Sequence, residues 1–157
     1  MKTNALRILE QKKIPHEAIE YPVDEDHLDA VSVAEKSGLE PCRVFKTLVT
    51  KGSKSGPAVF CIPGDQELNL KAAAKAAGEK KTEMLPLREL LPLTGYIHGG
   101  CSPLGMKKFL PFFLDESAFD FDRISISGGA RGIQVLLSPN DILKLTRGRS
   151  GAFTDNS

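Results

Sequence analysis

The stretch YIHGGCSPLGMKK, residues 96–108, gathers residue types that can do chemistry. His98 and Cys101 stand three positions apart with two glycines between them, and Lys107 and Lys108 follow. Such a stretch can be a phosphate-binding loop, a cysteine nucleophile with its histidine, a metal site or only a tight turn. Each possibility requires particular neighbours, so each can be tested against the sequence.

A nucleotide phosphate loop and a metal site both lack residues that they need. The phosphate loop requires a lysine after its last glycine, but Met106 follows Gly105. Zinc takes three or four protein ligands, and His98 with Cys101 supplies only two. The sequence therefore predicts no bound metal and no cofactor.

Covalent catalysis by Cys101 stays possible, because a glycine turn exposes side chains and His98 is near in sequence. No G-x-S-x-G elbow and no orienting acid accompanies this pair. A cysteine in such a setting is more often a small packed apolar residue. A cysteine-dependent hydrolase of small molecules remains an alternative, which thiol alkylation would test.

The glycines themselves have a direct use. Gly99 and Gly100 carry no side chain, so backbone N–H groups there can approach a ligand closely. Such donors can stabilise a carbonyl oxygen as negative charge develops on it. A second glycine turn, SISGGARG at 125–132, also follows an expected strand. Both loops could line the mouth of one pocket, or both could be ordinary hairpin turns.

The elements that must position these loops follow from apolar periodicity, caps and breakers. Helices are expected at residues 3–12, 32–38 with Ser32 as N-cap, 68–78 with Asn69 as N-cap, a short stretch after Pro86, and 138–146. Strands are expected at residues 16–22, 43–52, 54–64, 94–100, 109–116, 123–129 and 133–138, the second and third forming a hairpin. Short strands outnumber helices without a βαβ repeat, which predicts an α+β fold with a mixed, partly closed barrel-like sheet surrounded by helices.

Length and composition set the remaining bounds. The 157 residues fit one domain, expected at 1–146, with 147–157 as a flexible C-terminal tail. No apolar run of about 18 residues and no secretory signal is present, so we expect no membrane association. The 3 cysteines are odd in number and far apart, which predicts a reducing, cytoplasmic location.

Charge is unevenly distributed along the chain. The net charge is only +1, but residues 41–111 hold 11 Lys and Arg against 5 Asp and Glu. These lysines are either solvated surface residues or one face that attracts an anionic partner.

Several motifs taken together are similar to a known family. VFKTLV at 44–49, LNLKAAAKAAG at 68–78, TGYIHGGCSPLGMKK at 94–108 and ISGGARG at 126–132, in this order, resemble the YbaK/EbsC family. Its members are stand-alone aminoacyl-tRNA deacylases related to the editing domain of prolyl-tRNA synthetase. The likeness covers roughly residues 3–146 and is closest to the YbaK branch, which removes cysteine from mischarged proline tRNA. The family fold, a barrel-like mixed sheet with outer helices, agrees with the reading of the elements.

The resemblance implies a set of site residues. Lys46 corresponds to the functional lysine of the family, and Gly100 to the glycine whose backbone faces the aminoacyl group. Substrate-binding positions implied in the same way, or next to these, are Tyr21, Thr47, Cys101, Ser102, Ser127, Gly128 and Gln134. Two positions depart from the family pattern. Gln134 stands where an aspartate is usual, and Leu28 is the bulky apolar candidate where an aromatic residue is expected.

The resemblance also implies a mechanism and partners. The thiol of the substrate cysteine would attack its own carbonyl, so that no protein nucleophile is needed. Lys46 would orient the terminal adenosine, the backbone amide around Gly100 and Cys101 would polarise the carbonyl, and Ser127 would shape the pocket. The expected partners are the acceptor end of proline tRNA and prolyl-tRNA synthetase. Alternatives are a deacylase for alanine or another small residue on that tRNA, and a non-catalytic module that binds tRNA or a synthetase.

Overall fold

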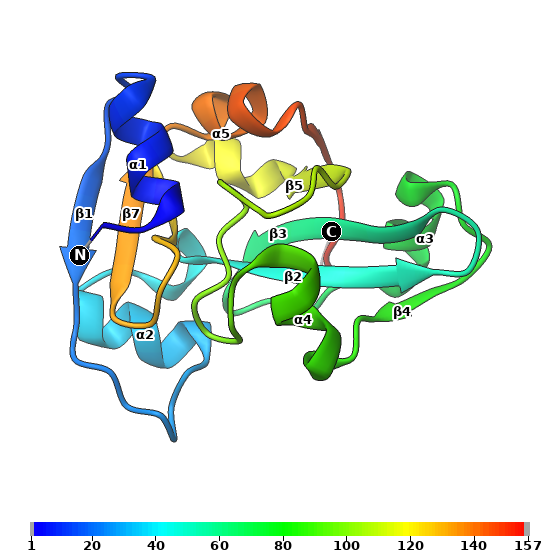
Figure 1. Cartoon of the computed structure of the whole chain (residues 1–157), viewed down its shortest axis with the longest axis horizontal. Coiled ribbons are helices and arrows are strands. Elements are labelled where there is room, and N and C mark those ends of the chain that lie inside the picture. The colour runs from blue at the N-terminus through cyan, green and yellow to red at the C-terminus, as the bar shows by residue number, and fades with distance from the viewer. Residues whose placement is uncertain (1, 156–157) are drawn as a thin grey trace.

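Two β-sheets organise the chain, and the computed structural model describes residues 2–155 of it (Figure 1). The first sheet is antiparallel, in the order β1–β7–β6, and its strands are β1 Glu17–Glu20, β7 Ile133–Leu137 and β6 Ile124–Ser127. The second sheet is mixed, in the order β4–β2–β3–β5–β8, and its strands are β4 Thr82–Met84, β2 Phe45–Gly52, β3 Gly56–Pro63, β5 Phe112–Asp115 and β8 Arg149–Gly151. The α+β class and the hairpin of β2 and β3 are confirmed.

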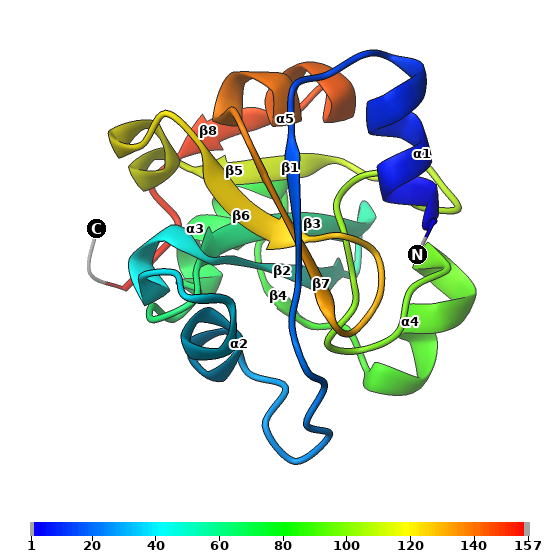
Figure 2. The same ribbon diagram turned by 90° about the vertical axis from the view of Figure 1, so that its left-hand side faces the viewer.

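The two sheets meet where β2 begins. Val44 forms a parallel bridge with Ser125 of β6, so the start of β2 lies against the first sheet while its remainder pairs within the second. Figure 2 shows β1, β7 and β6 crossing in front of the second sheet. This junction joins the two sheets and places Lys46 of β2 and Ser127 at the end of β6 on the wall of one cavity.

Five helices cover the sheets within the described residues: α1 Asn4–Gln11, α2 Ala30–Ser37, α3 Leu70–Ala77, α4 Leu87–Thr94 and α5 Pro139–Thr146. Short 3-10 turns occur at Pro41–Arg43 and Glu116–Asp120. None of the helices formed by residues 2–155 is long and apolar enough to cross a membrane.

Side chains cap four of the five helices of the described residues, and α4 follows Pro86 without a side-chain cap. Thr3, Asn69 and Ser138 each accept a hydrogen bond from a backbone N–H of the helix that follows. The cap of α2 is Asp29 and not Ser32, because the Asp29 carboxylate accepts both the N–H and the hydroxyl of Ser32. Ser32 is thus already inside the helix.

The core divides into two parts on either side of the second sheet. Alternation along β3 turns Val59 and Cys61 towards the larger cluster, which also includes residues of the first sheet, α1 and α5. Phe60 points the other way, and its ring stacks on that of Phe113 with centroids 5.0 Å apart. Phe153 closes this smaller cluster edge-on, 5.3 Å from the Phe60 centroid.

The end of the chain differs from the sequence prediction. The prediction of a flexible tail at 147–157 is wrong for residues 149–154, because β8 pairs in parallel with β5 and Thr154 forms a bridge with Leu68. Phe153 is 5% exposed and its N–H donates to the buried Asp115 carboxylate over 2.9 Å. Residues 156–157 lie outside the described part. The prediction failed because parallel pairing with a distant strand leaves no local pattern.

The expected strand at 94–100 is also absent. Helix α4 continues to Thr94, and the following residues form turns that use their own polar groups. The Thr94 hydroxyl accepts the N–H of Tyr96, and the Tyr96 hydroxyl donates to the carbonyl of Leu104 over 2.6 Å. These local bonds replace strand pairing and hold the loop 96–106 as a compact unit.

Candidate active site

A cavity of about 630 Å³ lies where the start of β2 meets the first sheet and the glycine loop. Its size suits a small-molecule group or the end of a larger ligand. The residues that line it are Glu25, Asp26, Leu28, Asp29, Ala30, Val33, Val44, Phe45, Lys46, Thr47, Leu48, Gly64, Leu90, His98, Gly99, Cys101, Ser127 and Gln134. Five of the predicted site residues are in this set, contributed by three separate stretches of the chain: Lys46, Thr47, Cys101, Ser127 and Gln134.

Lys46 places a cation on the wall of this cavity. Register opposite Ile62 fixes its position on β2, and its ammonium Nζ lies 3.4 Å from the carbonyl oxygen of Gly64. Within residues 2–155 it forms no ion pair with a carboxylate. Its charge is therefore available to an anionic ligand, such as a phosphate or a polarised ester.

The glycine loop docks on the β6–β7 turn through its backbone. A Cβ placed on Gly100 would lie 2.9 Å from the carbonyl carbon of Ala130 and from the nitrogen of Arg131, which is too close. The N–H of Gly100 donates to the carbonyl of Ile97 over 2.9 Å. The N–H of Gly100 is therefore already paired, and Gly100 is not among the residues that line the cavity.

The next amide along the chain, that of Cys101, has no such partner within residues 2–155. Within the described residues, the N–H of Cys101 donates to no protein acceptor, and Cys101 lines the cavity. Because a buried N–H needs a partner, this amide is the candidate donor for a ligand oxygen.

The thiol of Cys101 is unsuited to act as a nucleophile. The side chain is 8% exposed, and burial raises its pKa from 9.0 to about 11. At neutral pH the thiol keeps its proton, and the thiolate is the reactive form. Burial likewise raises the pKa of Cys61 to about 12, and that of Cys42 upwards. None of the three cysteines has the lowered pKa of a catalytic thiol.

Buried polar side chains from β6 and β7 form the far wall of the site. Ser127 and Gln134 pair across the two strands, line the cavity and are 9% and 5% exposed. The Ser125 hydroxyl, fully buried, donates to Oε1 of Gln134 over 2.7 Å. The hydroxyl of Ser127 accepts the N–H of Gly129 and so shapes the β6–β7 turn.

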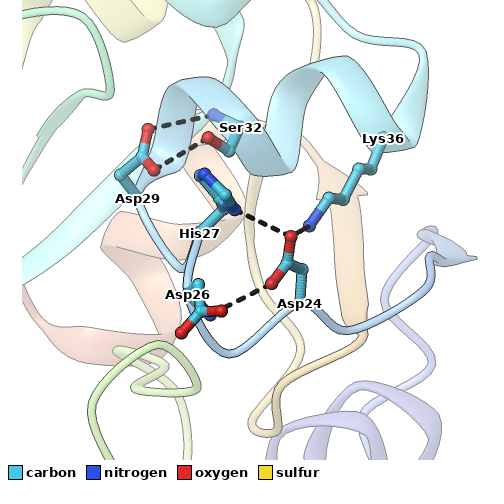
Figure 3. A network of polar contacts seen from close by, with 6 residues as sticks. All are labelled: Asp24, Asp26, His27, Asp29, Ser32 and Lys36. Atoms are coloured by element: carbon cyan, nitrogen blue, oxygen red, sulfur yellow. Dashed lines mark hydrogen bonds and ion pairs between the residues drawn. The ribbon is translucent and has the colours of Figure 1, made fainter.

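An acidic loop, residues 24–29, forms the rim and projects from the body below β1 (Figures 1 and 2). Figure 3 shows its internal contacts: the Asp24 carboxylate meets His27 at 2.7 Å and the Lys36 ammonium at 3.8 Å. The hydrogen bond from His27 and then the N–H of Asp26 lower the pKa of Asp24. Hydrogen bonds from Ser32 lower that of Asp29. These contacts hold the loop in place, with the side chains of Glu25, Asp26 and Asp29 at the cavity.

Arg131 ties three rim segments together, and sequence reasoning did not single it out. Its guanidinium Nε donates to the carbonyl of His98 over 2.9 Å, and its Nη1 lies 3.8 Å from the Glu25 carboxylate. The side chain also packs on Gly99, where a Cβ would be 3.3 Å from Nε. The sequence signal was the arginine inside the glycine turn SISGGARG, whose partners only the fold supplies.

Besides Gly100, three predicted residues do not line the cavity. Tyr21 donates its N–H to the carbonyl of Gly132, and the Gly128 carbonyl accepts the hydroxyl of Thr3. Ser102 is fully buried, and its hydroxyl accepts the N–H of Leu104 inside the glycine loop. Conversely, Leu28, the bulky apolar candidate, does line the cavity.

Within residues 2–155 no group of three or more His, Cys, Asp or Glu side chains is placed to hold a metal.

A second cavity of similar volume, lined by the end of β3 and by the 3-10 turn Glu116–Asp120, has a different character. Its lining includes the carboxylates Asp65, Asp115, Glu116 and Asp120 and no lysine or arginine. Such a wall repels phosphate groups. The first cavity also has carboxylates, those of Glu25, Asp26 and Asp29, but unlike the second it has a lysine, Lys46. It is therefore the better candidate for a ligand that carries phosphate.

Comparisons with known proteins show the family to which the chain is similar. Residues 24–145 match the family described as aminoacyl-tRNA editing domain. The chain is 54% identical over 153 residues to a protein of Enterococcus faecalis provisionally named Cys-tRNA(Pro)/Cys-tRNA(Cys) deacylase EbsC, and the match covers 98% of this chain and 93% of that protein.

Solved structures show the same fold. A protein provisionally described as a trans-editing enzyme for prolyl-tRNA synthetase superposes with a TM-score of 0.85 at 26% identity, covering 99% of both chains. A hypothetical protein of solved structure superposes with a TM-score of 0.85 at 19% identity, covering 95% of this chain and 97% of the other, and shares the fold alone.

Proposed function

Because the chain belongs to the family of aminoacyl-tRNA editing domains, we propose that it is a deacylase that removes cysteine from mischarged cysteinyl-tRNA(Pro). The relative that shares 54% of its residues carries a cysteinyl-tRNA deacylase name. The observation that carries the proposal is the cavity that joins the Lys46 ammonium to the amide of Cys101 and whose one lining thiol, that of Cys101, keeps its proton.

The chemistry matches what the cavity offers. An aminoacyl ester is already activated, so cleavage needs positioning and stabilisation of the carbonyl oxygen more than a strong base. Lys46 would hold the terminal phosphate or ribose of the acceptor end. The Cys101 N–H would donate to the ester carbonyl oxygen as its negative charge grows. The carboxylates of the acidic loop complement the positive α-ammonium group of the amino acid.

The nucleophile in this proposal belongs to the substrate. The sulfur of the substrate cysteine bonds to its own carbonyl carbon, and the ester C–O bond breaks. The ribose oxygen leaves with the thiol proton, which gives free tRNA and a cyclic thiolactone without net oxidation or consumption of water. Because burial raises the pKa of the thiol of Cys101 to about 11, the protein thiol is a poor competitor for this role.

Selectivity against the correct amino acid follows from the same chemistry. Proline has no side-chain thiol, and its ring is bulkier around the α-carbon, so a closely lined pocket can also exclude it by shape. Lining by Leu28, Val33 and Phe45 leaves an apolar surface for a small side chain. Alanine on the same tRNA is the alternative substrate, since it is smaller still, and in that case cleavage would use water.

The decisive experiment is a substrate panel. Purified protein would be incubated with proline tRNA carrying cysteine, alanine, serine or proline, and with cysteine tRNA carrying cysteine. We expect rapid release of cysteine from both tRNAs, and little release of the others, because only cysteine brings a good nucleophile. Cleavage of the alanyl ester at an equal rate would contradict the substrate-assisted mechanism, and no turnover of any ester would favour a non-catalytic binding module.

A synthetase partner and the role of the protein thiol can be tested in the same assay. Addition of prolyl-tRNA synthetase should increase the preference for proline tRNA if that enzyme supplies the tRNA identity. Prior alkylation of the free protein should leave the activity largely intact, because Cys61 and Cys101 are buried and the partly exposed Cys42 does not line the cavity. Complete inactivation by alkylation of Cys101 would instead favour a cysteine-dependent hydrolase.

A further inference from the structure

Three polar side chains on one face of the β6–β7 ladder are buried. Ser125, Ser127 and Gln134 share this face and are 0%, 9% and 5% exposed. Alternation turns Ile126 and Val135 to the opposite face, into the main core. Because buried polar groups are costly unless they are hydrogen-bonded, the partners of these side chains indicate what the face is for.

Gln134 has a partner for only half of its amide. The Ser125 hydroxyl donates to Oε1 over 2.7 Å, which orients the amide plane. The nitrogen Nε2, with two N–H donors, has no protein acceptor within residues 2–155, and Gln134 lines the cavity. The remaining hydrogen-bonding capacity of this buried side chain is therefore that of a donor, available to a ligand.

We infer that Gln134 is a neutral hydrogen-bond donor to the aminoacyl group, and that Ser125 is the positioning residue that holds its amide in the donating orientation. This inference rests on the proposed deacylase function and assigns the pair within it. Ser125 itself is fully buried and is absent from the cavity lining, so it acts through Gln134.

In this proposal, the atom that accepts the hydrogen bond from Nε2 of Gln134 is one that gains negative charge during the reaction. Two atoms of a cysteinyl ester do so: the carbonyl oxygen after attack, and the sulfur as it loses its proton. A neutral amide stabilises either one, whereas a carboxylate at the same position would repel both. The common chemistry is donation to a developing anion.

A charge change at Gln134 tests the donor role. Gln134→Glu keeps the size of the side chain and an acceptor for Ser125. Its ionised carboxylate, however, has no hydrogen to donate at neutral pH. We expect the single-turnover rate on cysteinyl-tRNA(Pro) to fall about 10²-fold at neutral pH. The rate relative to wild type should recover as the pH is lowered, because the protonated carboxyl group donates again. Gln134→Ala should show the loss without the recovery.

A double-mutant cycle tests the positioning role. Ser125→Ala should reduce the rate about 10-fold in the wild-type background and have no further effect in Gln134→Ala, because its target is gone. Thr50→Val is the matched control, since it also removes a buried hydroxyl, which donates to the Ala58 carbonyl away from the cavity. Denaturant unfolding of each variant separates loss of folding from loss of activity.

Non-reactive analogues identify the acceptor atom. The aminoacyl adenosine in which an amide replaces the ester would be prepared with cysteine and with alanine. If Nε2 binds the carbonyl oxygen, Gln134→Ala weakens both analogues equally; if it binds sulfur, only the cysteinyl analogue is weakened. Unchanged affinity for both, together with wild-type turnover by Gln134→Glu, would overturn the inference.

Failure of this inference can be told apart from failure of the function. If wild-type protein cleaves no ester of the panel, the proposed function is wrong. If wild-type protein is active and the Gln134 and Ser125 variants are equally active, the function stands and the donor assignment is wrong. An equal effect of Ser125→Ala in both backgrounds likewise overturns the positioning role.

Discussion

Lys46 carries a positive charge on the cavity wall without a carboxylate partner among the described residues, so its chemistry is directed at the ligand. Truncation should therefore affect catalysis more than stability. We expect Lys46→Ala to lower kcat/KM for cysteinyl-tRNA(Pro) by about 10²-fold, as for the loss of one charge-stabilising donor. Lys46→Arg should keep part of the activity because it keeps the charge.

The measurement is a deacylation time course with labelled aminoacyl-tRNA, compared with unfolding in urea. Lys144→Ala is the control, since this exposed lysine lies on α5, away from the cavity. Wild-type turnover by Lys46→Ala would refute the role of the lysine.

The buried thiol of Cys101 predicts how stability depends on pH. Its pKa is about 11 in the folded chain and near 9.0 when unfolded, so above pH 9 the unfolded state loses the proton first. The contribution is complete below pH 9 and is lost as the pH rises towards 11, by on the order of 2–3 kcal/mol. Urea unfolding at pH 8 and pH 10.5 should therefore show a smaller pH-dependent loss in Cys101→Ala than in wild type. Equal losses would mean that the thiol is accessible.

At the scale of elements, the glycine loop and the β6–β7 turn act as one unit. Gly100→Ala brings a Cβ to 2.9 Å from the backbone of Ala130 and Arg131, so one of the two loops must move. We expect a destabilisation of about 1–3 kcal/mol and a clear loss of deacylation, because the Cys101 amide moves with the loop.

Gly78→Ala is the control for this substitution. It occupies the left-handed C-cap of α3 at φ +75 with no atom within 4 Å of the new Cβ, so it costs about 1 kcal/mol without contact with the cavity. Comparable activity losses in both variants, measured at equal fraction folded, would contradict the docking role of Gly100.

The C-terminal strand β8 and the residues after it belong to the folded unit. Phe153→Ala removes a ring that packs on Phe60 and Phe113, and should lower the free energy of unfolding by about 3–5 kcal/mol. Phe109→Ala is the matched control, because that ring is 70% exposed. Thermal or urea unfolding of the two variants measures the difference, and equal stabilities would show that the end of the chain is not part of the core.

At the scale of the whole molecule, positive charge collects at the end of the second sheet that is remote from the cavity. Lys54 lies in the β2–β3 turn, and Lys80 and Lys81 precede β4, which pairs beside that turn. Glu79 joins the two segments by accepting the N–H groups of Lys54 and Ser55. Along β2, Gly52 at this end lies about 20 Å from Lys46.

A tRNA whose terminal adenosine enters the cavity can reach these lysines with its backbone. We expect the triple variant of Lys54, Lys80 and Lys81 to alanine to bind tRNA more weakly. The slope of log affinity against log salt should decrease by about 2, as for the loss of three phosphate contacts.

The control removes three positive charges elsewhere, from Arg7 and Lys12 at the N-terminal helix and Lys144 on α5. Its slope should stay close to that of wild type. An identical change in both triple variants would mean that only net charge matters, and no change in the lysine variant would exclude this face from the tRNA contact.

Local patterns in the sequence determined most of the elements. Thr3, Asn69 and Ser138 start their helices because a side-chain oxygen can cap the first turn whatever the surroundings. The β2–β3 hairpin follows from two β-rich runs around a short turn. The motifs that resemble the editing family were also sufficient to indicate Lys46, Cys101, Ser127 and Gln134, which do line one cavity.

Only the tertiary structure decided how these residues act. The parallel pairing of β8 with β5, the docking of Gly100 against Ala130 and the Ser125–Gln134 hydrogen bond join segments far apart or on separate elements. Composition and periodicity describe one segment at a time, whereas the partner of a buried amide or thiol depends on which segments pack around it. For that reason the sequence indicated which residues form the site, and the fold determined which backbone N–H is free, which thiol keeps its proton and which amide can donate.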